Sequence, residues 1–386
     1  MTPPHKPPPL QIDKIKKNPM YLFLAVLTIA STIGLQAWIT LFNNFAVEVA
    51  SLDGDSIGII QSVREIPGFL ALLAVFVILF IKEHRLSVLS IFILGVGLAA
   101  TGMFPSFTGL ALTTLVMSFG FHYYETTNMS LTLQYFNENE SPWVSGKLRS
   151  LAAASSIGIG VLIFLLASIL NFTQLYLIIG GLIVAVALWG FTQNPADRNI
   201  VPQRKRLIFR KKYGLFYFLY FMAGARRQIF MAFSVLLMVQ KFNYSLQEIT
   251  LLFVINNIIN YFLSPLIGKG IIRFGERKIL SMEYLSLVFI FLAYAFTDSK
   301  IIVAVLYILD HIFFNFSIAI RTYFQKVGDP RDIAPTMAVG FTINHIAAVF
   351  LPALGGLLWV MNYRIPFIGG AAMAAISLIA VQKIKT

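Results

Sequence analysis

The feature that most constrains this chain is a succession of apolar runs, each long enough to cross a membrane as a helix. Such a helix needs about 20 mostly apolar residues. Twelve runs meet this requirement. They lie near residues 20–46, 56–81, 86–104, 107–136, 146–170, 174–192, 213–240, 246–272, 279–297, 301–325, 333–359 and 363–382. The sequence therefore predicts an all-α membrane protein with twelve transmembrane helices.

Composition supports this fold class and excludes several functions. The chain is 58% hydrophobic and only 12% charged, whereas a soluble domain carries about 25% charged residues. It has no Cys, which excludes disulfides and thiolate chemistry. No phosphate-binding Gly-x-x-x-x-Gly-Lys loop and no recognisable pairing of a nucleophile with a base are present, so we expect neither an ATPase nor another enzyme, and no cofactor.

One long hydrophilic connection divides the runs into two sets of six. It spans residues 193–212 and is rich in Arg and Lys. We therefore expect an N-terminal tail over 1–19 that its prolines keep extended, a six-helix bundle over 20–192, a basic linker over 193–212, and a second bundle over 213–386.

The distribution of basic residues predicts the orientation in the membrane. Of the 30 Lys and Arg residues, 24 fall on the side that holds both termini and the linker, counting the ends of the runs that adjoin this side. Three lie on the opposite side (Lys241, Lys300 and Arg364), and three lie within the runs (Arg64, Arg226 and Arg227). Basic residues concentrate in cytoplasmic loops. We expect a multi-pass protein of a bacterial inner membrane with both termini cytoplasmic, and we attribute its net charge of +13 to topology rather than to nucleic-acid binding.

The two halves carry weak signs of internal duplication. Tyr135-Phe136 is followed by a polar turn and Pro142, and Tyr323-Phe324 is followed by a polar turn and Pro330. The same offset places His122 opposite Asp310. Internal repeats of this kind are a property of many transporter folds, in which the substrate lies between the repeats near the bilayer midplane.

Polar residues inside the runs are distributed selectively. Runs 3 and 6 hold no charge, run 12 holds none beyond Arg364 at its outer end, and run 9 holds only Glu283 near its cytoplasmic end. The remaining eight carry the costly ionisable and amide groups, which need partners or a water-filled cavity. This division resembles the major facilitator superfamily, in which helices 3, 6, 9 and 12 lie outside and the other eight line a central cavity.

A second resemblance lies between runs 8 and 9, where residues 268–278 are similar to the cytoplasmic loop motif of that superfamily. The matching residues, which the resemblance assigns to conformational change, are Gly268, Arg273, Gly275, Arg277 and Lys278. The first-half copy is eroded to residues 82–85, and Val116 stands four residues before Gly120, where proton-coupled members often carry Arg. The resemblance implies secondary active transport by alternating access, and these departures argue against drug–proton exchange.

The charged groups within the runs indicate the class of substrate. Arg226 and Arg227 are adjacent and near mid-membrane, so an anion must lie nearby; Glu65, Glu125, Asp310 and a bound substrate are the candidates. Arg binds carboxylate or phosphate through a planar fork. Neighbouring helical residues point about 100° apart, so we expect Arg64 and Glu65 to face different partners. We predict a small anionic or zwitterionic organic solute as substrate.

The predicted site has two sets of residues. The substrate-binding set comprises Gln36, Arg64, Tyr123, Tyr124, Arg226, Arg227, Asn256, Asn260, Asn344 and His345. The set that would carry a coupling proton, if protons drive transport, comprises Glu65, His122, Glu125, Asp310 and His311. The alternative to proton coupling is a structural role, in which these groups only form hydrogen bonds with buried polar neighbours. No HxxxH or HExxH spacing occurs, so we expect no metal site.

Two other functions remain open at this stage. Within transport, the abundant aromatic residues allow efflux of amphipathic or drug-like compounds. In another class, the fold could serve lipid translocation or a non-transporting membrane scaffold. We expect membrane lipid around a monomer, and no nucleic-acid partner.

Overall fold

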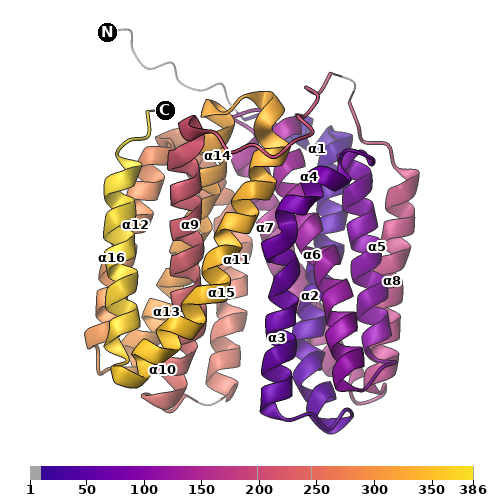
Figure 1. Cartoon of the computed structure of the whole chain (residues 1–386), viewed down its shortest axis with the longest axis vertical. Helices are drawn as coiled ribbons and strands as arrows, with labels where there is room; N and C mark the ends of the chain where they lie inside the picture. The colour runs from indigo at the N-terminus through magenta and orange to yellow at the C-terminus, as the bar shows by residue number, and fades with distance from the viewer. Residues whose placement is uncertain (1–9, 198, 245, 386) are drawn as a thin grey trace.

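The computed structural model describes residues 10–197, 199–244 and 246–385. Two helical bundles stand side by side, one formed by the first half of the chain and one by the second, with both termini at the same end (Figure 1). The linker crosses between the bundles at that end. We call it the terminus end.

The first bundle contains all six predicted helices. Its elements are α1 (Ile12–Lys17), α2 (Pro19–Glu48), α3 (Gly54–Phe69), η1 (Leu70–Leu73), α4 (Ala74–Val77), α5 (Glu83–Thr101), α6 (Phe107–Tyr135), α7 (Ser141–Leu166) and α8 (Phe172–Thr192). Helix α1 and the buried side chain of Ile15 correct the expectation of an extended tail for its described part; residues 1–9 lie outside the described residues.

The second bundle repeats the order. Its elements are η2 (Lys211–Tyr213), α9 (Gly214–Ile229), the π-helical η3 (Phe230–Ser234), α10 (Val235–Gln240), α11 (Leu246–Phe274), α12 (Glu276–Phe296), α13 (Lys300–Phe314), η4 (Asn315–Ser317), α14 (Ile318–Val327), η5 (Pro330–Asp332), α15 (Ile333–Met361) and α16 (Arg364–Val381). Counting the interrupted helices as single spans, the described residues form twelve transmembrane helices in two six-helix pseudo-repeats.

Among the described residues, nine helical segments are long and apolar enough to cross a membrane by length and composition alone. The other three spans are α6, the α9–η3–α10 segment and α15. Helix α6 carries His122 and Glu125, and α9 carries Arg226 and Arg227, so polar groups lower the hydropathy of these two spans. The least apolar spans therefore include those that hold the candidate site.

Local sequence explains where several helices begin. Asn18 accepts a hydrogen bond from Met20 N ahead of Pro19 at the first position of α2. Ser106 caps α6, and Asn171 forms a reciprocal capping box with Gln174 at α8. Side-chain oxygens at these positions satisfy backbone N–H groups that have no partner within the helix.

Pro67 explains the interruption of the second span. A proline inside a helix lacks an N–H group and distorts the preceding turn. Helix α3 ends two residues later and continues as the 3₁₀ segment η1. The backbone N–H of Leu72 then donates to Thr342 Oγ1 of α15 at 2.9 Å. The break thus joins the first bundle to the second.

In the structure the residues of the loop motif are divided between a helix and a turn. Gly268 and Arg273 lie within α11, and only Gly275, with a φ of +79°, forms the turn into α12. Gly268 instead allows a close helix approach, because a Cβ there would lie 2.8 Å from Trp143 Cα of α7. Arg277 donates to Gln382 Oε1, and Lys278 is exposed at the start of α12.

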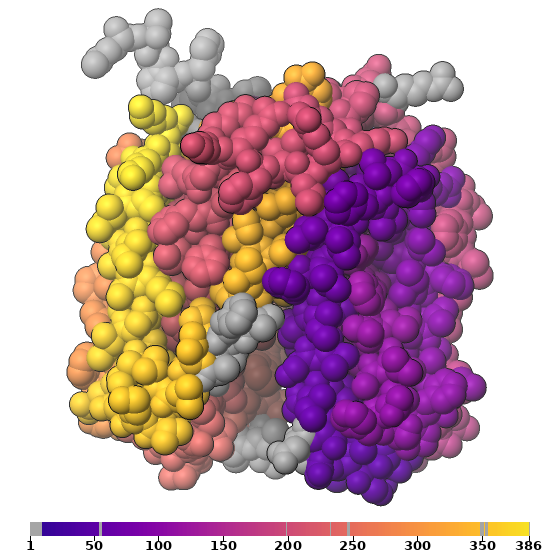
Figure 2. Space-filling view, in the orientation of Figure 1, coloured from indigo at the N-terminus to yellow at the C-terminus, as the bar shows by residue number. Residues whose placement is uncertain are grey.

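The bundles are pressed together towards the terminus end and separate away from it. Gly146 of α7 meets the backbone of Ser264 in α11, where a Cβ would lie 2.9 Å from the carbonyl carbon. Ser150 Oγ donates to the carbonyl of Tyr261 at 2.6 Å. Figure 2 shows the face hollowed between the bundles on the side away from the linker.

Candidate functional site

A cavity of about 240 Å³ lies between the bundles and contains charged groups from both. Helix α6 contributes Glu125 and Asn128, α7 contributes Arg149, and α14 of the second bundle contributes Arg321. Apolar and hydroxyl groups of α2, including Thr28, complete the lining. We call this the Glu125 cavity.

Arg149 is fixed by a chain of amide groups from the second bundle. Its guanidinium donates to Asn315 Oδ1, and Asn315 Nδ2 donates to Asn260 Oδ1 at 2.6 Å. The guanidinium carbon also lies 5.4 Å from the ring centre of Phe314. A cation held in this way is pre-positioned for an anion.

Glu125 and Arg321 have no hydrogen bond or ion pair to any part of the chain that the structure describes. Both line the cavity. Asn128 Oδ1 also lacks a partner although it is buried. Buried polar groups normally have partners, so these three side chains are available to a solute.

A second group of titratable side chains lies at the seam between the bundles. Glu65 of α3, His122 of α6 and His345 of α15 each offer a ligand atom within 4.8 Å of the others. Phe121 lines the Glu125 cavity, and its ring centre lies 5.1 Å from that of His122. The seam cluster and the cavity are therefore neighbours. In the sequence these three residues lie in separate predicted helices, and no pattern indicates that they meet.

Arg64 and Glu65 pair with each other, which corrects the expectation that they face different partners. Arg64 Nη2 lies 2.6 Å from Glu65 Oε1. The guanidinium also lies 5.3 Å from the ring centre of Trp38. The positions of adjacent helical residues differ by about 100°, but rotation about the bonds of these two long side chains lets their charged ends meet.

Arg226 and Arg227 occupy different environments, as adjacent helical residues should. Arg226 is 3% exposed and lies 3.4 Å from Glu283 Oε1 of α12. It also donates to Ser377 Oγ of α16 at 2.6 Å. Glu283 was not among the partners predicted from the sequence, because its place near a helix end suggested a solvated group. Its nearly complete burial makes it the counter-ion.

Arg227 makes no ion pair or hydrogen bond within the described residues. Electrostatic interactions connect it with Glu65, His345 and Tyr220, and connect Tyr220 in turn with Arg149 and Arg321. Arg227 lines the small pocket that also holds Arg226 and Asp310, and it interacts with the groups of the Glu125 cavity only through longer-range electrostatics. It remains available to a ligand, whereas Arg226 is occupied.

Asp310 lies beside Arg226 in a small enclosed pocket. Asp310, Arg226 and Glu283 line it together, and Asp310 Oδ2 has no hydrogen-bond partner in the described structure. His311 is turned towards aromatic rings, with the ring centres of Phe230 and Tyr307 at 5.2 and 5.5 Å. His122 and Asp310 occupy corresponding positions in the two halves of the sequence, but their surroundings in the structure differ.

The remaining predicted site residues are dispersed. Tyr124 is fully buried and bonded to Thr28 Oγ1 at 2.7 Å, so it packs α6 against α2 and does not line the Glu125 cavity. Tyr123 donates to Leu70 O, and Asn344 donates to Tyr220 O. Gln36 Nε2 donates to Thr40 Oγ1 on its own helix.

Asn256 is buried, and both polar atoms of its amide lack hydrogen-bond partners in the described structure.

Arg149 and Arg321 were not predicted to bind substrate, because their positions in the sequence suggested cytoplasmic helix ends. Their basic charge inside apolar runs was the available signal. Only the packing of α7 and α14 across the seam shows that both reach the cavity.

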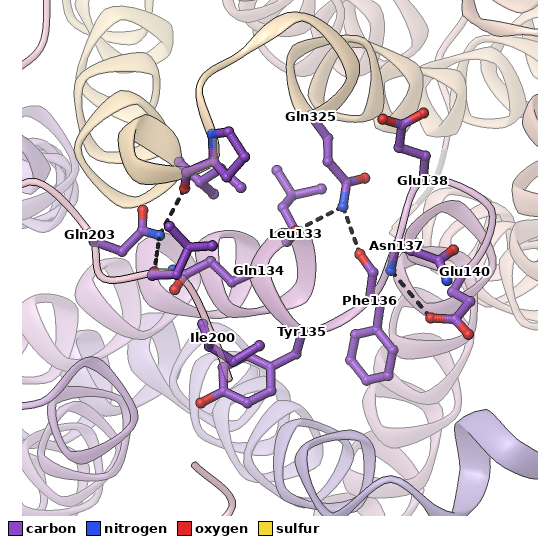
Figure 3. A pocket seen from close by; sticks show the side chains of 13 residues that line it. Leu133, Gln134, Tyr135, Phe136, Asn137, Glu138, Glu140, Ile200, Gln203 and Gln325 are labelled. Atoms are coloured by element: carbon purple, nitrogen blue, oxygen red, sulfur yellow. Dashed lines mark hydrogen bonds between the residues drawn. The ribbon is translucent and has the colours of Figure 1, made fainter. Parts of the chain in front are cut away.

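Two surface pockets at the terminus end, of about 400 and 600 Å³, are formed by the linker and adjoining loops. Figure 3 shows the first, where Gln325 of α14 donates to the carbonyls of Leu133 and Phe136 at the end of α6. Gln203 of the linker donates to Pro330 O on the opposite wall. These contacts close the terminus end across both bundles.

Two six-helix bundles around a central charged cavity define a polytopic membrane protein with a transporter fold. A family model described as Major Facilitator Superfamily matches residues 216–384. The match covers the second bundle, and the solved structures below share the fold of the whole chain. Comparison with curated proteins gives no match.

Solved structures of transporters share the fold over nearly the whole chain. The human organic anion transporter MFSD10 gives a TM-score of 0.76 at 12% identity, covering 95% of this chain and 99% of that one. The E. coli fucose:proton symporter FucP gives 0.78 at 13%, covering 95% and 98%. A bacterial homologue of the iron transporter ferroportin in its outward-facing state gives 0.74 at 13%, covering 94% and 98%.

Proposed function

We propose that the protein is a secondary transporter that moves a small organic anion across a bacterial inner membrane by alternating access. The observation that carries this proposal is the Glu125 cavity, in which Arg149 and Arg321 meet between the two bundles. Arg227 lies within electrostatic reach of the same group. Two guanidinium groups and one carboxylate line the cavity, and a third guanidinium lies outside it, so the excess of positive charge favours an anionic or zwitterionic ligand.

The size of the cavity favours this substrate class over the alternatives. Sites for drug-sized ligands usually occupy about 300–1,000 Å³, and the Glu125 cavity measures about 240 Å³. An amphipathic drug or a lipid chain would remove water from the charged lining and offer no hydrogen bonds or charges in return, which is costly. A small carboxylate or phosphate would instead pair with the guanidinium groups.

The similar structures include an organic anion transporter, a fucose:proton symporter and a homologue of an iron transporter. One fold thus serves chemically unlike solutes, and the substrate follows from the site rather than from the fold. For this reason the assignment of an anion rests on Arg149, Arg321 and Arg227. Coupling to protons would fall to the carboxylates beside them.

Alternating access requires that one end close while the other is open. The terminus end is closed by Ser141 Oγ, which pairs with Gln325 Oε1, and by the close approach of α7 and α11. On the proposed topology this arrangement faces outward. Rocking of the bundles would part α7 from α11 and expose the cavity to the cytoplasm.

Orientation, membrane and oligomeric state form part of the proposal. The excess of basic residues at the terminus end supports cytoplasmic termini, and a cavity formed within one chain supports a working monomer in lipid. A phosphatase reporter, active only in the periplasm, should be inactive when fused after Thr386 and active when inserted in the loop after Phe296 of α12. The opposite pattern would refute this topology.

Ligand stabilisation tests the substrate class directly. Purified protein would be heated with mono- and dicarboxylates, inorganic phosphate and, as comparison, organic cations of equal size. A ligand at 100 times its Kd stabilises the folded state by about 2.7 kcal/mol, so one anion series should raise the melting temperature and cations should not. Uptake of the best anion into proteoliposomes would then establish transport.

The matched variants are Arg321→Gln and Arg364→Gln. Arg321 lines the cavity, whereas Arg364 lies at the opposite end of the molecule beside Tyr363. Only Arg321→Gln should abolish the anion-dependent stabilisation. Stabilisation by cations alone, or equal loss in both variants, would overturn the proposal of an anion site.

A further inference from the structure

The seam cluster has the chemistry of a metal site, although no spacing in the sequence indicates one. Glu65, His122 and His345 come from α3, α6 and α15, and their ligand atoms lie within 4.8 Å of one another. Two imidazoles and a carboxylate form a common ligand set for first-row transition metals. Metal bonds of about 2.0–2.2 Å separate neighbouring donors by about 3 Å, so small side-chain rotations would complete the site.

Hydrogen bonding fixes which nitrogen of each imidazole is free. His345 Nδ1 lies 2.9 Å from Phe341 O, and a carbonyl only accepts, so Nδ1 carries the proton. His122 Nδ1 lies 2.9 Å from both Ser118 O and Ser118 Oγ. Because the Ser118 hydroxyl gives its proton to Arg64 O, His122 Nδ1 must donate as well. Both neutral rings therefore present an unprotonated Nε2.

Donation from Nδ1 to a backbone carbonyl is the usual outer support of a metal-binding histidine, because it fixes the tautomer and the ring orientation. Aromatic packing holds the same rings: Phe341 stacks on His345 with centres 4.4 Å apart. His122 and His345 are each 4% exposed. Neither ring needs to reorganise substantially to bind an ion.

Gly68 allows the free edges of the two rings to pack directly against α3. A Cβ at Gly68 would lie 2.7 Å from His345 Nε2 and 2.8 Å from His122 Cδ2. The Cδ2–Nε2 edges therefore face the same point on α3, one turn after Glu65. Any larger residue at this position would displace both rings.

We propose that Glu65, His122 and His345 bind one divalent transition-metal ion, such as Zn²⁺ or Co²⁺, across the seam between the bundles. Glu65 would exchange its contact with Arg64 for the ion, and Arg64 would keep its place over Trp38. Because α3 and α6 belong to one bundle and α15 to the other, the bound ion would hold the arrangement in which the bundles meet here. This proposal does not depend on the identity of the transported solute.

Titration of the purified, full-length protein with the metal alone tests this site. The protein should carry no polyhistidine tag, since a tag would bind the same ions. Zn²⁺ and Co²⁺ should bind at one equivalent with affinity at least tenfold above that for Mg²⁺ and Ca²⁺, which prefer oxygen ligands. Bound Co²⁺ should also give visible absorption bands typical of imidazole coordination.

The variants His122→Gln, His345→Gln and Glu65→Gln should each lower the affinity for Zn²⁺ at least tenfold and remove the Co²⁺ bands. The matched control is His84→Gln, which removes a buried imidazole at the start of α5, outside the cluster. Size-exclusion profiles and melting temperatures without metal would show that each variant is folded. Gly68→Ala provides an independent variant that keeps all three ligands but fills their space, and it should also lose Zn²⁺ binding.

Three results would overturn the proposal. The first is Zn²⁺ affinity no greater than that for Mg²⁺. The second is unchanged Zn²⁺ affinity in the folded variants of the cluster, and the third is an equal loss in His84→Gln. None of these results bears on anion stabilisation through Arg321, so the two proposals fail separately.

Discussion

Arg226 Nη2 lies 3.4 Å from Glu283 Oε1, and both side chains are almost completely buried. The pair joins α9 to α12 inside the second bundle, and the ring centre of Tyr284 lies 4.3 Å from the guanidinium carbon. Removing one partner of a buried ion pair leaves an uncompensated charge and typically costs about 3–5 kcal/mol.

Glu283→Gln should therefore lower the stability of the protein by about 3–5 kcal/mol, measured by thermal or denaturant unfolding in detergent. The comparison is Asp298→Asn, which breaks the exposed ion pair with Lys241 and should change the melting temperature little. A stability of Glu283→Gln equal to that of the parent would show that Arg226 does not depend on this carboxylate.

Arg227→Lys should keep the fold and weaken anion binding, because lysine lacks the planar fork of arginine. A lost charge-assisted contact of about 1.5–3 kcal/mol corresponds to an affinity about ten- to hundredfold lower. Arg226→Lys should instead lower stability and leave affinity nearly unchanged, because Arg226 is occupied by Glu283 and Ser377. Isothermal titration of both variants with the identified anion distinguishes the two roles. Equal affinities in parent and Arg227→Lys would remove Arg227 from the site.

At least one of Glu65, Glu125 and Asp310 should carry a proton during transport. Glu125 has no partner within the described residues, and Asp310 shares Arg226 with Glu283. Carboxylates at membrane depth that have no close ion pair of their own are costly to keep charged. Glu65→Gln, Glu125→Gln and Asp310→Asn would be assayed for uptake across a range of pH. If all three retained the pH dependence of the parent, coupling through these groups would be excluded.

Gly146→Ala should shift the protein towards an arrangement open at the terminus end. The new methyl group would meet the backbone of Ser264, which cannot rotate away. Overpacking of about 1–3 kcal/mol corresponds to a population shift of about five- to 150-fold. The chain has no Cys, so a single Ala152→Cys in the cavity reports access cleanly.

The measurement is the rate at which a membrane-impermeant maleimide, applied from the terminus side, labels Ala152→Cys. Gly146→Ala should raise this rate. Gly158→Ala on the same helix is the matched control, since a Cβ there meets nothing within 4 Å. Equal labelling rates in the two glycine variants would contradict closure through α7 and α11.

Asp329 should stabilise the linker contact at neutral pH and lose this effect in acid. The side chain and backbone N–H of Arg331, with Arg204 of the linker, hold the pKa of Asp329 well below its ordinary value. A carboxyl group whose pKa is lower in the folded than in the unfolded protein stabilises the folded state at pH values above its unfolded pKa of about 4. This contribution is lost as the pH falls towards the folded-state pKa. The melting temperature of the parent should exceed that of Asp329→Asn from pH 7 to 5 and converge with it below pH 4. A difference independent of pH would refute this linkage.

The sequence by itself determined the membrane class and the twelve helical spans. These depend on local properties, because a run of apolar residues must form a helix in lipid, where every backbone group needs a partner. Helix periodicity also explains why the adjacent Arg226 and Arg227 have different surroundings, since neighbouring helical residues point about 100° apart. The choice of Glu283 as the partner of Arg226 depended on how deeply α12 is packed, which no local pattern encodes.

Only the tertiary structure decided which residues meet. Glu65 pairs with Arg64 because flexible side chains can fold over one another, and His122 meets His345 because Pro67, Gly68 and α15 bring two bundles together at one point. Arg149 and Arg321 reach the same cavity from different halves of the chain. Contacts between helices far apart in sequence depend on the angle and rotation of each helix in the bundle. Packing across the whole molecule sets the angle and rotation of each helix, so the tertiary structure is needed to determine them.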